Sequence, residues 1–564
     1  MLLLRKFNSK KKKKVALIIS IFLFIVGLSF HLKLASEGGF KTSYRVEPLA
    51  FRSEDGTYFN AFKYTPKGEK SHGGIVVSHY LSGNKLIMHP LSTELVKRGF
   101  TVINLEFRGH GASSDPFLSG ELINDMKTAV DYLRYNVSYI TEIGLVGHSL
   151  GARVALEFVK AYPDEINATV MIGRLPPNGT NISNLLMAVG PLEQWITRED
   201  IINALRSYTG QVNVSIGKLY YGDFKGGNNI KAIIGSFSEH YTEPFDPSII
   251  YETVQWFEQA FKGEIADDVM IRAPISQIFS YLTIFGVIAI SLILITYFSK
   301  FIFKRKFIYP EKTILSNPKD PTVLDLLKYY TFYSIFFGLL IYVLLAVILS
   351  RIIIFSTSNI IMLLIVGIAF GSSFTYNVMV MYRQEKLSIK CFPSKIKEMC
   401  RTNPTRSIFY GIIASLLIIS SLAAVWHTDP HNIMINFKEM GIIILLTLVS
   451  FPFFLIKEFY FRNVHGRLKT PKRYREYLYM VSLGIFMDSF LILMIRLITW
   501  LNVIIMPVYI LYLSIWIYFS IIQNFFTTWV YMWSGRNILG STMFLSIFYA
   551  WVSVIFFPSI GFFN

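Results

Sequence analysis

Ile143-Gly-Leu-Val-Gly-His-Ser-Leu-Gly-Ala-Arg153 is the stretch of sequence from which the fold and the chemistry can best be predicted. The apolar residues 143–146 predict a short buried strand, and a helical pattern begins at Ala152. Between them, residues 147–151 read Gly-x-Ser-x-Gly. A strand–turn–helix of this kind is so sharp that the serine side chain stands above the sheet, and larger residues in place of the glycines would collide with neighbouring backbone. The stretch therefore predicts an exposed Ser149 at a helix N-terminus, where N–H groups favour negative charge.

The overall composition indicates a membrane protein with more than one domain. The chain has 564 residues, of which 52% are hydrophobic, and a formal net charge of +18. Its mean hydropathy of +0.44 is too high for an ordinary soluble enzyme. Because Lys and Arg gather beside apolar segments, we attribute the charge to membrane topology and expect no nucleic acid partner. The two cysteines, Cys391 and Cys400, are far in sequence from Ser149 and predict neither a disulfide framework nor a thiolate metal site.

Composition divides the chain into three segments. Residues 1–35 join the basic run Lys10–Lys14 to an apolar run, which predicts a cytoplasmic tail and a transmembrane anchor. A cleavable signal peptide has the same shape, but His31-Leu-Lys33 is not a small-residue cleavage site. Residues 36–268 have a soluble composition and can bury a full core. Residues 269–564 consist of apolar runs, each near the about 20 residues that a spanning helix needs.

We expect about eight spanning helices in this last segment, in addition to the anchor. Basic loops follow the first, third and fifth runs, so the positive-inside rule predicts an integral protein of the cell membrane with residues 36–268 on the extracytoplasmic side. N-glycosylation sequons at Asn136, Asn167, Asn178, Asn181 and Asn213 agree with this orientation and predict a glycoprotein. The expected runs are 275–298, 328–350, 358–380, 407–426, 440–456, 478–499, 502–522 and 540–560.

Four charged residues near these runs need an interpretation. Lys457 and Arg462 are assigned to the basic loop after the fifth run. Asp488 and Arg496 fall inside an apolar run, where charge is costly and usually faces a partner or a cavity. They mark either a functional site or a helix end, and both alternatives stay open.

Strand and helix patterns alternate through residues 36–268, which predicts an α/β fold with a mostly parallel sheet covered on both faces. Ligands bind at the carboxyl ends of the strands in such sheets, where Ser149 is expected. The expected strands are 74–78, 100–107, 143–146, 168–172, 185–189 and 231–234, and the expected helices are 90–98, 125–135, 152–161, 198–208 and 247–261.

Two strand ends downstream of Ser149 carry the groups that a serine nucleophile needs, namely a base and an acid that orients the base. His240 follows the strand at 231–234, and Glu193 follows the strand at 185–189. Asp223 is an alternative acid. The chain order serine, acid, histidine is that of the α/β-hydrolases.

Residues from about 45 to 262 resemble α/β-hydrolases of the esterase, lipase and dienelactone-hydrolase kind. The motifs that carry the resemblance are Val76-Val-Ser-His-Tyr-Leu-Ser-Gly83, Phe107-Arg-Gly-His-Gly-Ala-Ser113, Gly147–Gly151, Gly190–Glu193 and Glu239-His240. The resemblance implies that Ser149 is the nucleophile, Glu193 the acid and His240 the base. It also implies an oxyanion hole made by the N–H groups of Leu81 and Leu150.

The sequence departs from the family at one point that bears on this site. The family usually has His-Gly in the oxyanion loop, and this chain has His79-Tyr80, which predicts a narrower pocket or a differently turned loop. His79, His110 and His148 are interpreted as structural.

These patterns predict a membrane-anchored serine hydrolase that needs no cofactor and no metal. The expected partners are an ester or lipid-like small-molecule substrate and membrane lipid. One alternative is a ligand-binding, transport or signalling protein whose hydrolase domain has lost catalysis. Another is a peptidase or acyltransferase that uses the same three residues, because specificity is set by the pocket and not by the fold. The oligomeric state stays open.

Overall fold

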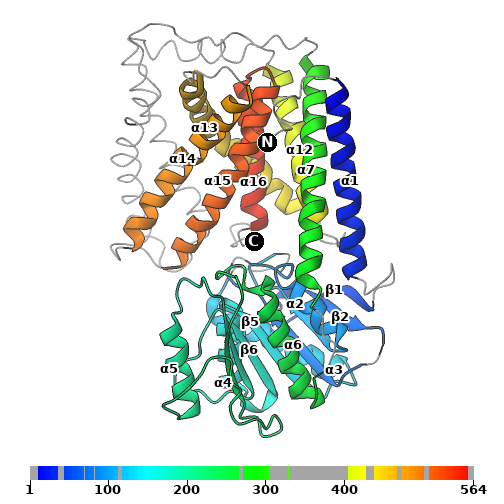
Figure 1. The fold of residues 1–564 in the computed structure, drawn as a ribbon, viewed down its shortest axis with the longest axis vertical. Coiled ribbons are helices and arrows are strands. Elements are labelled where there is room, and N and C mark those ends of the chain that lie inside the picture. Colours follow the sequence, from blue (N-terminus) through cyan, green and yellow to red (C-terminus); the bar gives the residue numbers. More distant parts are fainter. Residues whose placement is uncertain are drawn as a thin grey trace. The chain divides into compact units, whose positions relative to one another are not determined.

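The computed structural model describes most of residues 10–303 and five helices between 404 and 556 (Figure 1). The described ranges are 10–35, 43–68, 70–81, 83–111, 113, 117–265, 271–303, 328, 404–426, 437–466, 473–500 and 507–556. The chain divides into two units. One, here called the sheet unit, comprises Ile25–Thr283 with Ile555–Asn564, and the other, the helical unit, comprises Met1–Phe24 with Ile284–Val554.

An eight-stranded sheet forms the centre of the sheet unit, in the order β1-β2-β4-β3-β5-β6-β7-β8. All neighbouring pairs from β4 to β8 are parallel, whereas β1 and β2 pair antiparallel with each other and β2 pairs antiparallel with β4. The mostly parallel sheet that the sequence predicted is confirmed. The strands are β1 (Tyr44–Arg52), β2 (Tyr58–Pro66), β3 (Gly73–Ser78), β4 (Thr101–Leu105), β5 (Glu142–His148), β6 (Ala168–Ile172), β7 (Leu185–Val189) and β8 (Ile230–Ile234).

The antiparallel strands β1 and β2 are absent from the sequence prediction. In β1, exposed residues alternate with less exposed ones from Pro48 onward, as in a strand with one face toward solvent. Such alternation is a usable signal, but polar residues interrupt the apolar ones in β1, so it is weaker than the continuous apolar runs of the parallel strands.

Helices cover both faces of the sheet and bury a separate core on each. Successive residues of β3 show the division, since Val76 belongs to one cluster of buried residues and Ile75 and Val77 to the other. The first cluster includes residues of α3 (Leu122–Asn136), α4 (Leu150–Ala161) and α5 (Arg198–Thr209). The second includes residues of α2 (His89–Lys97) and α6 (Pro247–Lys262). This two-sided packing holds the carboxyl ends of the strands rigidly in place.

Two long helices, α1 (Lys10–Ala35) and α7 (Ala273–Phe303), run side by side (Figure 1). Glycines make the close approach possible. A Cβ on Gly27 would lie 2.6 Å from Thr283 N, and one on Gly286 would lie 2.6 Å from Phe24 N. Small residues at such crossings are typical of helices that associate in membranes.

Among the described residues, three helical segments have the length and apolar composition to cross a membrane, namely Ile278–Phe303, Pro404–Leu422 and Met440–Arg462. Shorter apolar helices cover Lys14–Phe30 and Ile538–Val554. The runs predicted at 328–350 and 358–380 and both cysteines lie outside the described residues, apart from Lys328. The helical unit otherwise contains α12 (Pro404–Trp426), α13 (Phe437–Gly466), α14 (Arg473–Trp500), α15 (Pro507–Trp533) and α16 (Ile538–Phe556).

The assignment of Lys457 and Arg462 to a basic loop was wrong, because α13 continues to Gly466 and both side chains are buried within the bundle. Lys457 Nζ lies 2.7 Å from Asp488 Oδ2, and Arg462 Nη2 lies 2.8 Å from Glu458 Oε2. A buried cation is tolerated when an anion is paired with it, and the anion for Lys457 comes from another helix. Asp488 lies in the middle of α14 and not at its end. The side chain of Arg496 lies outside the described residues.

Candidate active site

Ser149 occupies the turn between β5 and α4 in a strained backbone conformation, with φ 53° and ψ −101°. Non-glycine residues rarely adopt positive φ, and such strain persists only where the surrounding structure enforces it. The two flanking glycines permit the close backbone packing around this turn. A Cβ on Gly147 would lie 2.3 Å from Ala152 N, and one on Gly151 would lie 2.5 Å from Ser78 O. A larger residue would therefore collide with backbone at both positions, as the sequence predicts.

Replacing Gly147 with alanine should displace the turn, because the new methyl group meets backbone atoms that cannot rotate away. We expect a lower thermal midpoint of the full-length protein in detergent and slower labelling of Ser149 by a fluorophosphonate. Gly120→Ala is the matched control, since nothing lies within 4 Å of the position of its Cβ. Equal labelling of the two variants would show that the turn tolerates a side chain.

The structure brings Ser149, His240 and Glu193 into one hydrogen-bonded chain. His240 Nε2 lies 3.0 Å from Ser149 Oγ, and His240 Nδ1 lies 2.7 Å from Glu193 Oε2. The side chains of His240 and Glu193 are 2% and 1% exposed, so the pair is shielded from water. In this geometry the imidazole can take the hydroxyl proton while the carboxylate holds the opposite N–H.

Local hydrogen bonds orient the carboxylate of Glu193. Its Oε1 accepts from the backbone N–H groups of Gln194 and Trp195, which leaves Oε2 for His240. The alternative acid, Asp223, lies in an exposed turn where its Oδ1 accepts from Lys225 N. Of the two acids considered from the sequence, the structure joins Glu193 to His240.

A buried aspartate that sequence reasoning missed holds the loop before His240. Asp246 Oδ2 accepts hydrogen bonds from the N–H groups of Ser236, Phe237 and Ser238, and its Oδ1 accepts from Ser248 N at the start of α6. Aspartate before Pro247 is a typical helix N-cap, which was the available signal. The additional bonds, from residues 236–238 to Asp246, form only because that loop folds back over the start of α6.

The two segments proposed to supply the oxyanion hole lie against each other. Gly151 N, in the first turn of α4, donates to His79 O at 3.2 Å. The loop that carries Leu81 is closed by a hydrogen bond from Gly83 N to Tyr80 O, and Leu150 begins α4. At position 80, where this chain has tyrosine in place of the usual glycine, the Tyr80 ring packs edge-on against His148, with ring centroids 5.1 Å apart.

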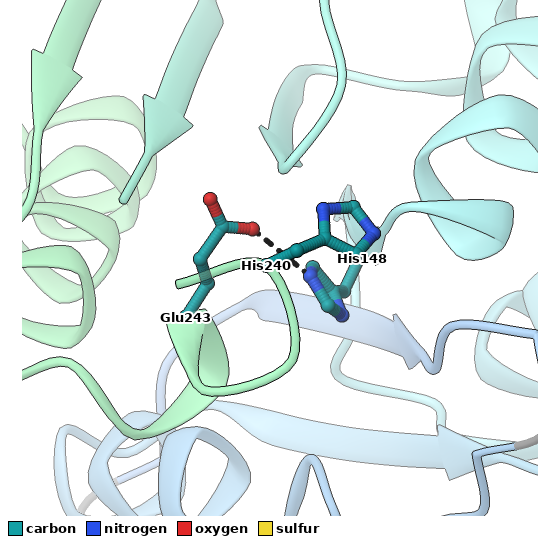
Figure 2. A group of neighbouring side chains, drawn as sticks. All are labelled: His148, His240 and Glu243. Carbon is teal, nitrogen blue, oxygen red and sulfur yellow. Dashed lines mark hydrogen bonds and ion pairs between the residues drawn. The ribbon is translucent and has the colours of Figure 1, made fainter. Parts of the chain in front are cut away.

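Glu243 is a second acidic residue at the site, and sequence reasoning missed it. Its Oε1 accepts from Gly190 N at 2.6 Å, and its Oε2 lies 3.0 Å from His148 Nε2 (Figure 2). Burial raises the pKa of Glu243 to about 9 and holds that of His148 well below its usual range. Nothing local in the sequence predicts the contact between Glu243 and His148, because glutamate side chains are usually exposed to solvent.

His148, His240 and Glu243 offer ligand atoms within 4.8 Å of one another, and these are atom types that can hold Zn²⁺. Most of these candidate ligand atoms already have hydrogen-bond partners within the protein. Both nitrogens of His240 are taken by Ser149 and Glu193, and Glu243 is bonded through both oxygens. The arrangement fits a hydrogen-bonded network better than a metal centre.

Comparison with known proteins finds a family match within the sheet unit. Residues 69–194 match the family described as serine aminopeptidase, S33, a range that includes Ser149 and Glu193 but ends before His240. Over 109 residues, 19% of this chain and 38% of the relative, the sequence is 35% identical to 2-(acetamidomethylene)succinate hydrolase of Mesorhizobium japonicum. An uncharacterized protein of Salmonella typhi is 28% identical over 123 residues, which cover 21% of this chain and 42% of that one. The chain thus spans about two fifths of the length of these relatives.

Solved structures of similar fold include an esterase of Pyrococcus furiosus, which is 17% identical with a TM-score of 0.31 and covers 39% of this chain and 94% of its own. A serine hydrolase without a lid from Xanthomonas campestris is 16% identical with a TM-score of 0.30, covering 40% of this chain and 97% of its own. From the sheet topology and the family match, we conclude that the sheet unit has an α/β-hydrolase-like fold and that residues 69–194 are similar to the S33 serine hydrolases.

Proposed function

We propose that this protein is a membrane-anchored serine hydrolase that cleaves esters through Ser149, His240 and Glu193. The observation that carries the proposal is the continuous hydrogen-bonded chain from Ser149 Oγ through the ring of His240 to Glu193. These groups follow β5, β7 and β8, three strands of the parallel part of the sheet, at the edge where such sheets bind ligands. Ligand binding without catalysis would not require these three side chains to form one hydrogen-bonded chain.

In the proposed mechanism, His240 accepts the Ser149 proton as Oγ attacks the substrate carbonyl. Glu193 accepts the Nδ1–H of the ring, fixes its tautomer and stabilises the imidazolium. The N–H groups of Leu81 and Leu150 stabilise the oxyanion of the tetrahedral intermediate. The departing alcohol takes its proton from His240, and water activated by the same ring then hydrolyses the acyl-enzyme.

An apolar rim beside His240 supports an apolar group in the substrate. Leu192, Trp195 and Phe237 are 64%, 50% and 58% exposed, and they belong to the loops that carry Glu193 and His240. The Trp195 ring packs against His240, with ring centroids 4.4 Å apart. Large exposed apolar side chains grouped at a site commonly mark a binding surface, so an acyl or alkyl chain is the favoured occupant.

Membrane attachment is supported by the apolar helices of the described chain. The proposed orientation, with the sheet unit extracytoplasmic, rests on the basic N-terminal run and the basic loops. In that arrangement the helices hold the hydrolase at the bilayer, which suits lipid or acylated substrates.

Hydrolysis of an N-terminal peptide bond is the second candidate, and the description of the S33 family match favours it. An aminopeptidase needs an anionic group for the substrate ammonium. Glu239 is a half-buried carboxylate one residue from His240 and accepts from Gln194 Nε2, so it is the candidate for that role.

The test uses the full-length protein in detergent, with a fluorophosphonate probe, p-nitrophenyl esters and aminoacyl p-nitroanilides. We expect the probe to label Ser149 and the esters to be hydrolysed faster as the acyl chain lengthens from two to eight carbons. Anilide turnover that exceeds ester turnover would favour the aminopeptidase. Absence of labelling and of turnover in a folded sample would favour a non-catalytic ligand-binding, transport or signalling protein.

A further inference from the structure

Each member of the Ser149–His240–Glu193 chain lies on a separate loop, and the Glu243 side chain reaches all three loops. It contacts the first through His148, the residue directly before Ser149. It contacts the second through Gly190, three residues before Glu193. It belongs to the third loop itself, three residues after His240. Figure 2 shows its carboxyl group directed toward the imidazoles of His148 and His240.

We propose that Glu243 is a positioning residue that works as a neutral carboxylic acid, donating its proton to His148 and accepting from Gly190, and thereby holds the three loops in register. The inference rests on the proposed function of Ser149. In this arrangement Oε2–H donates to His148 Nε2, and Gly190 N–H donates to Oε1. Both oxygens of the acid are then satisfied, and the imidazole of His148 is neutral with its proton on Nδ1.

The surroundings of Glu243 favour the neutral form. Its side chain is 0% exposed, and so is that of His148. Two further carboxylates, Glu193 and Glu239, act on it electrostatically, and both raise its pKa. The other titratable neighbours described around Glu243 and His148 supply no permanent positive charge; they are His79, Tyr80, His240 and Tyr241. A second buried anion here would be unpaired and costly, so the proton stays on Glu243 and Glu193 remains the carboxylate that serves His240.

Gly173 makes room for this arrangement. Its φ is 63°, and a Cβ there would lie 2.3 Å from Glu243 Oε2, 3.0 Å from His148 Nε2 and 3.1 Å from His240 Cε1. The backbone after β6 therefore packs directly on the point where the acid and the two imidazoles meet. Glu243 fills that point with a hydrogen-bonding group, where an apolar side chain would leave Gly190 N–H and His148 unpaired.

The decisive comparison is between Glu243→Gln and Glu243→Leu in the full-length protein. Glutamine reproduces the protonated acid, since its amide oxygen accepts from Gly190 N and its amide N–H donates to His148 Nε2. We expect Glu243→Gln to keep kcat/KM and fluorophosphonate labelling close to wild type. Glu243→Leu should lose on the order of 10²-fold in kcat with a smaller change in KM, because misplacement of the three groups acts on the chemical step. Glu199→Gln is the matched control, because the Glu199 side chain is 70% exposed on α5 and pairs there with Arg206.

The pH dependence of thermal stability distinguishes this role from simple space filling, because a residue that only fills space would not change it. With a folded pKa of about 9 against an ordinary 4.5, folded Glu243 keeps a proton that the unfolded chain releases above pH 4.5. Wild type should therefore lose stability relative to Glu243→Gln as pH rises from 5 to 9. Samples are heated at each pH, cooled and labelled with the fluorophosphonate at one fixed pH. The half-inactivation temperature of the Gln variant minus that of wild type should increase across this range.

Two results would overturn the proposal. One is a Glu243→Gln variant as inactive as Glu243→Leu while still folded, which would mean that the ionised carboxylate is required. The other is a half-inactivation difference that stays constant with pH. Failure of the proposed function would look different, because wild type itself would then neither label nor turn over ester.

Discussion

Replacing Ser149 with alanine should abolish ester turnover, lowering kcat by roughly 10⁶-fold, the scale seen when a triad nucleophile is removed. The physical reason is that His240 Nε2 faces Ser149 Oγ at 3.0 Å, and alanine offers no oxygen to attack the carbonyl. The measurement is hydrolysis of a short activated p-nitrophenyl ester by the full-length protein in detergent. Fluorophosphonate labelling should disappear in parallel.

Ser119→Ala is the control for this variant, because Ser119 Oγ is bonded to Arg153 on the exposed surface. It should keep wild-type turnover and labelling. If Ser149→Ala retained wild-type turnover, the nucleophile assignment would fail. The protein would then be better described as a binding protein with a hydrolase-like fold.

Replacing Glu193 with glutamine should lower kcat by on the order of 10³–10⁴-fold while leaving the fold intact. The carboxylate accepts from His240 Nδ1–H at 2.7 Å and so keeps Nε2 free to take the serine proton. A glutamine amide can instead donate to Nδ1, which stabilises the tautomer whose Nε2 is already protonated. His240→Ala should lose at least as much, because it removes the base itself.

Asp223→Asn provides the matched comparison, since it makes the same chemical change at the alternative acid. Asp223 is exposed and bonded within its own turn, so we expect nearly unchanged turnover. Ester hydrolysis by the two variants decides the acid. An inactive Asp223→Asn together with an active Glu193→Gln would reassign the acid but leave the hydrolase proposal standing.

The parallel strands and the groups at their ends were predictable from the sequence because each depends on local pattern and chain order. Continuous apolar runs identified β3 to β8, and glycine spacing identified the turn at Ser149. Parallel strands bring their carboxyl ends to one edge, so residues that directly follow three such strands must converge. That is why Glu193 and His240 could be named before their contact was seen, and why Asp223, which follows no expected strand, was only the alternative acid.

Tertiary structure alone decided which charged residues are buried and what they contact. Glu243, Asp246, Lys457 and Arg462 look like solvated residues in the sequence, yet all four are buried. Whether a charged group is exposed or buried depends on partners that other segments bring to it. Glu243 meets Gly190 and His148 across 53 and 95 residues, and Lys457 meets Asp488 across 31. Sequence periodicity indicates which face of an element is apolar. The hydrogen-bonding or charged partner that offsets the desolvation cost of a buried polar group is known only once the chain has folded.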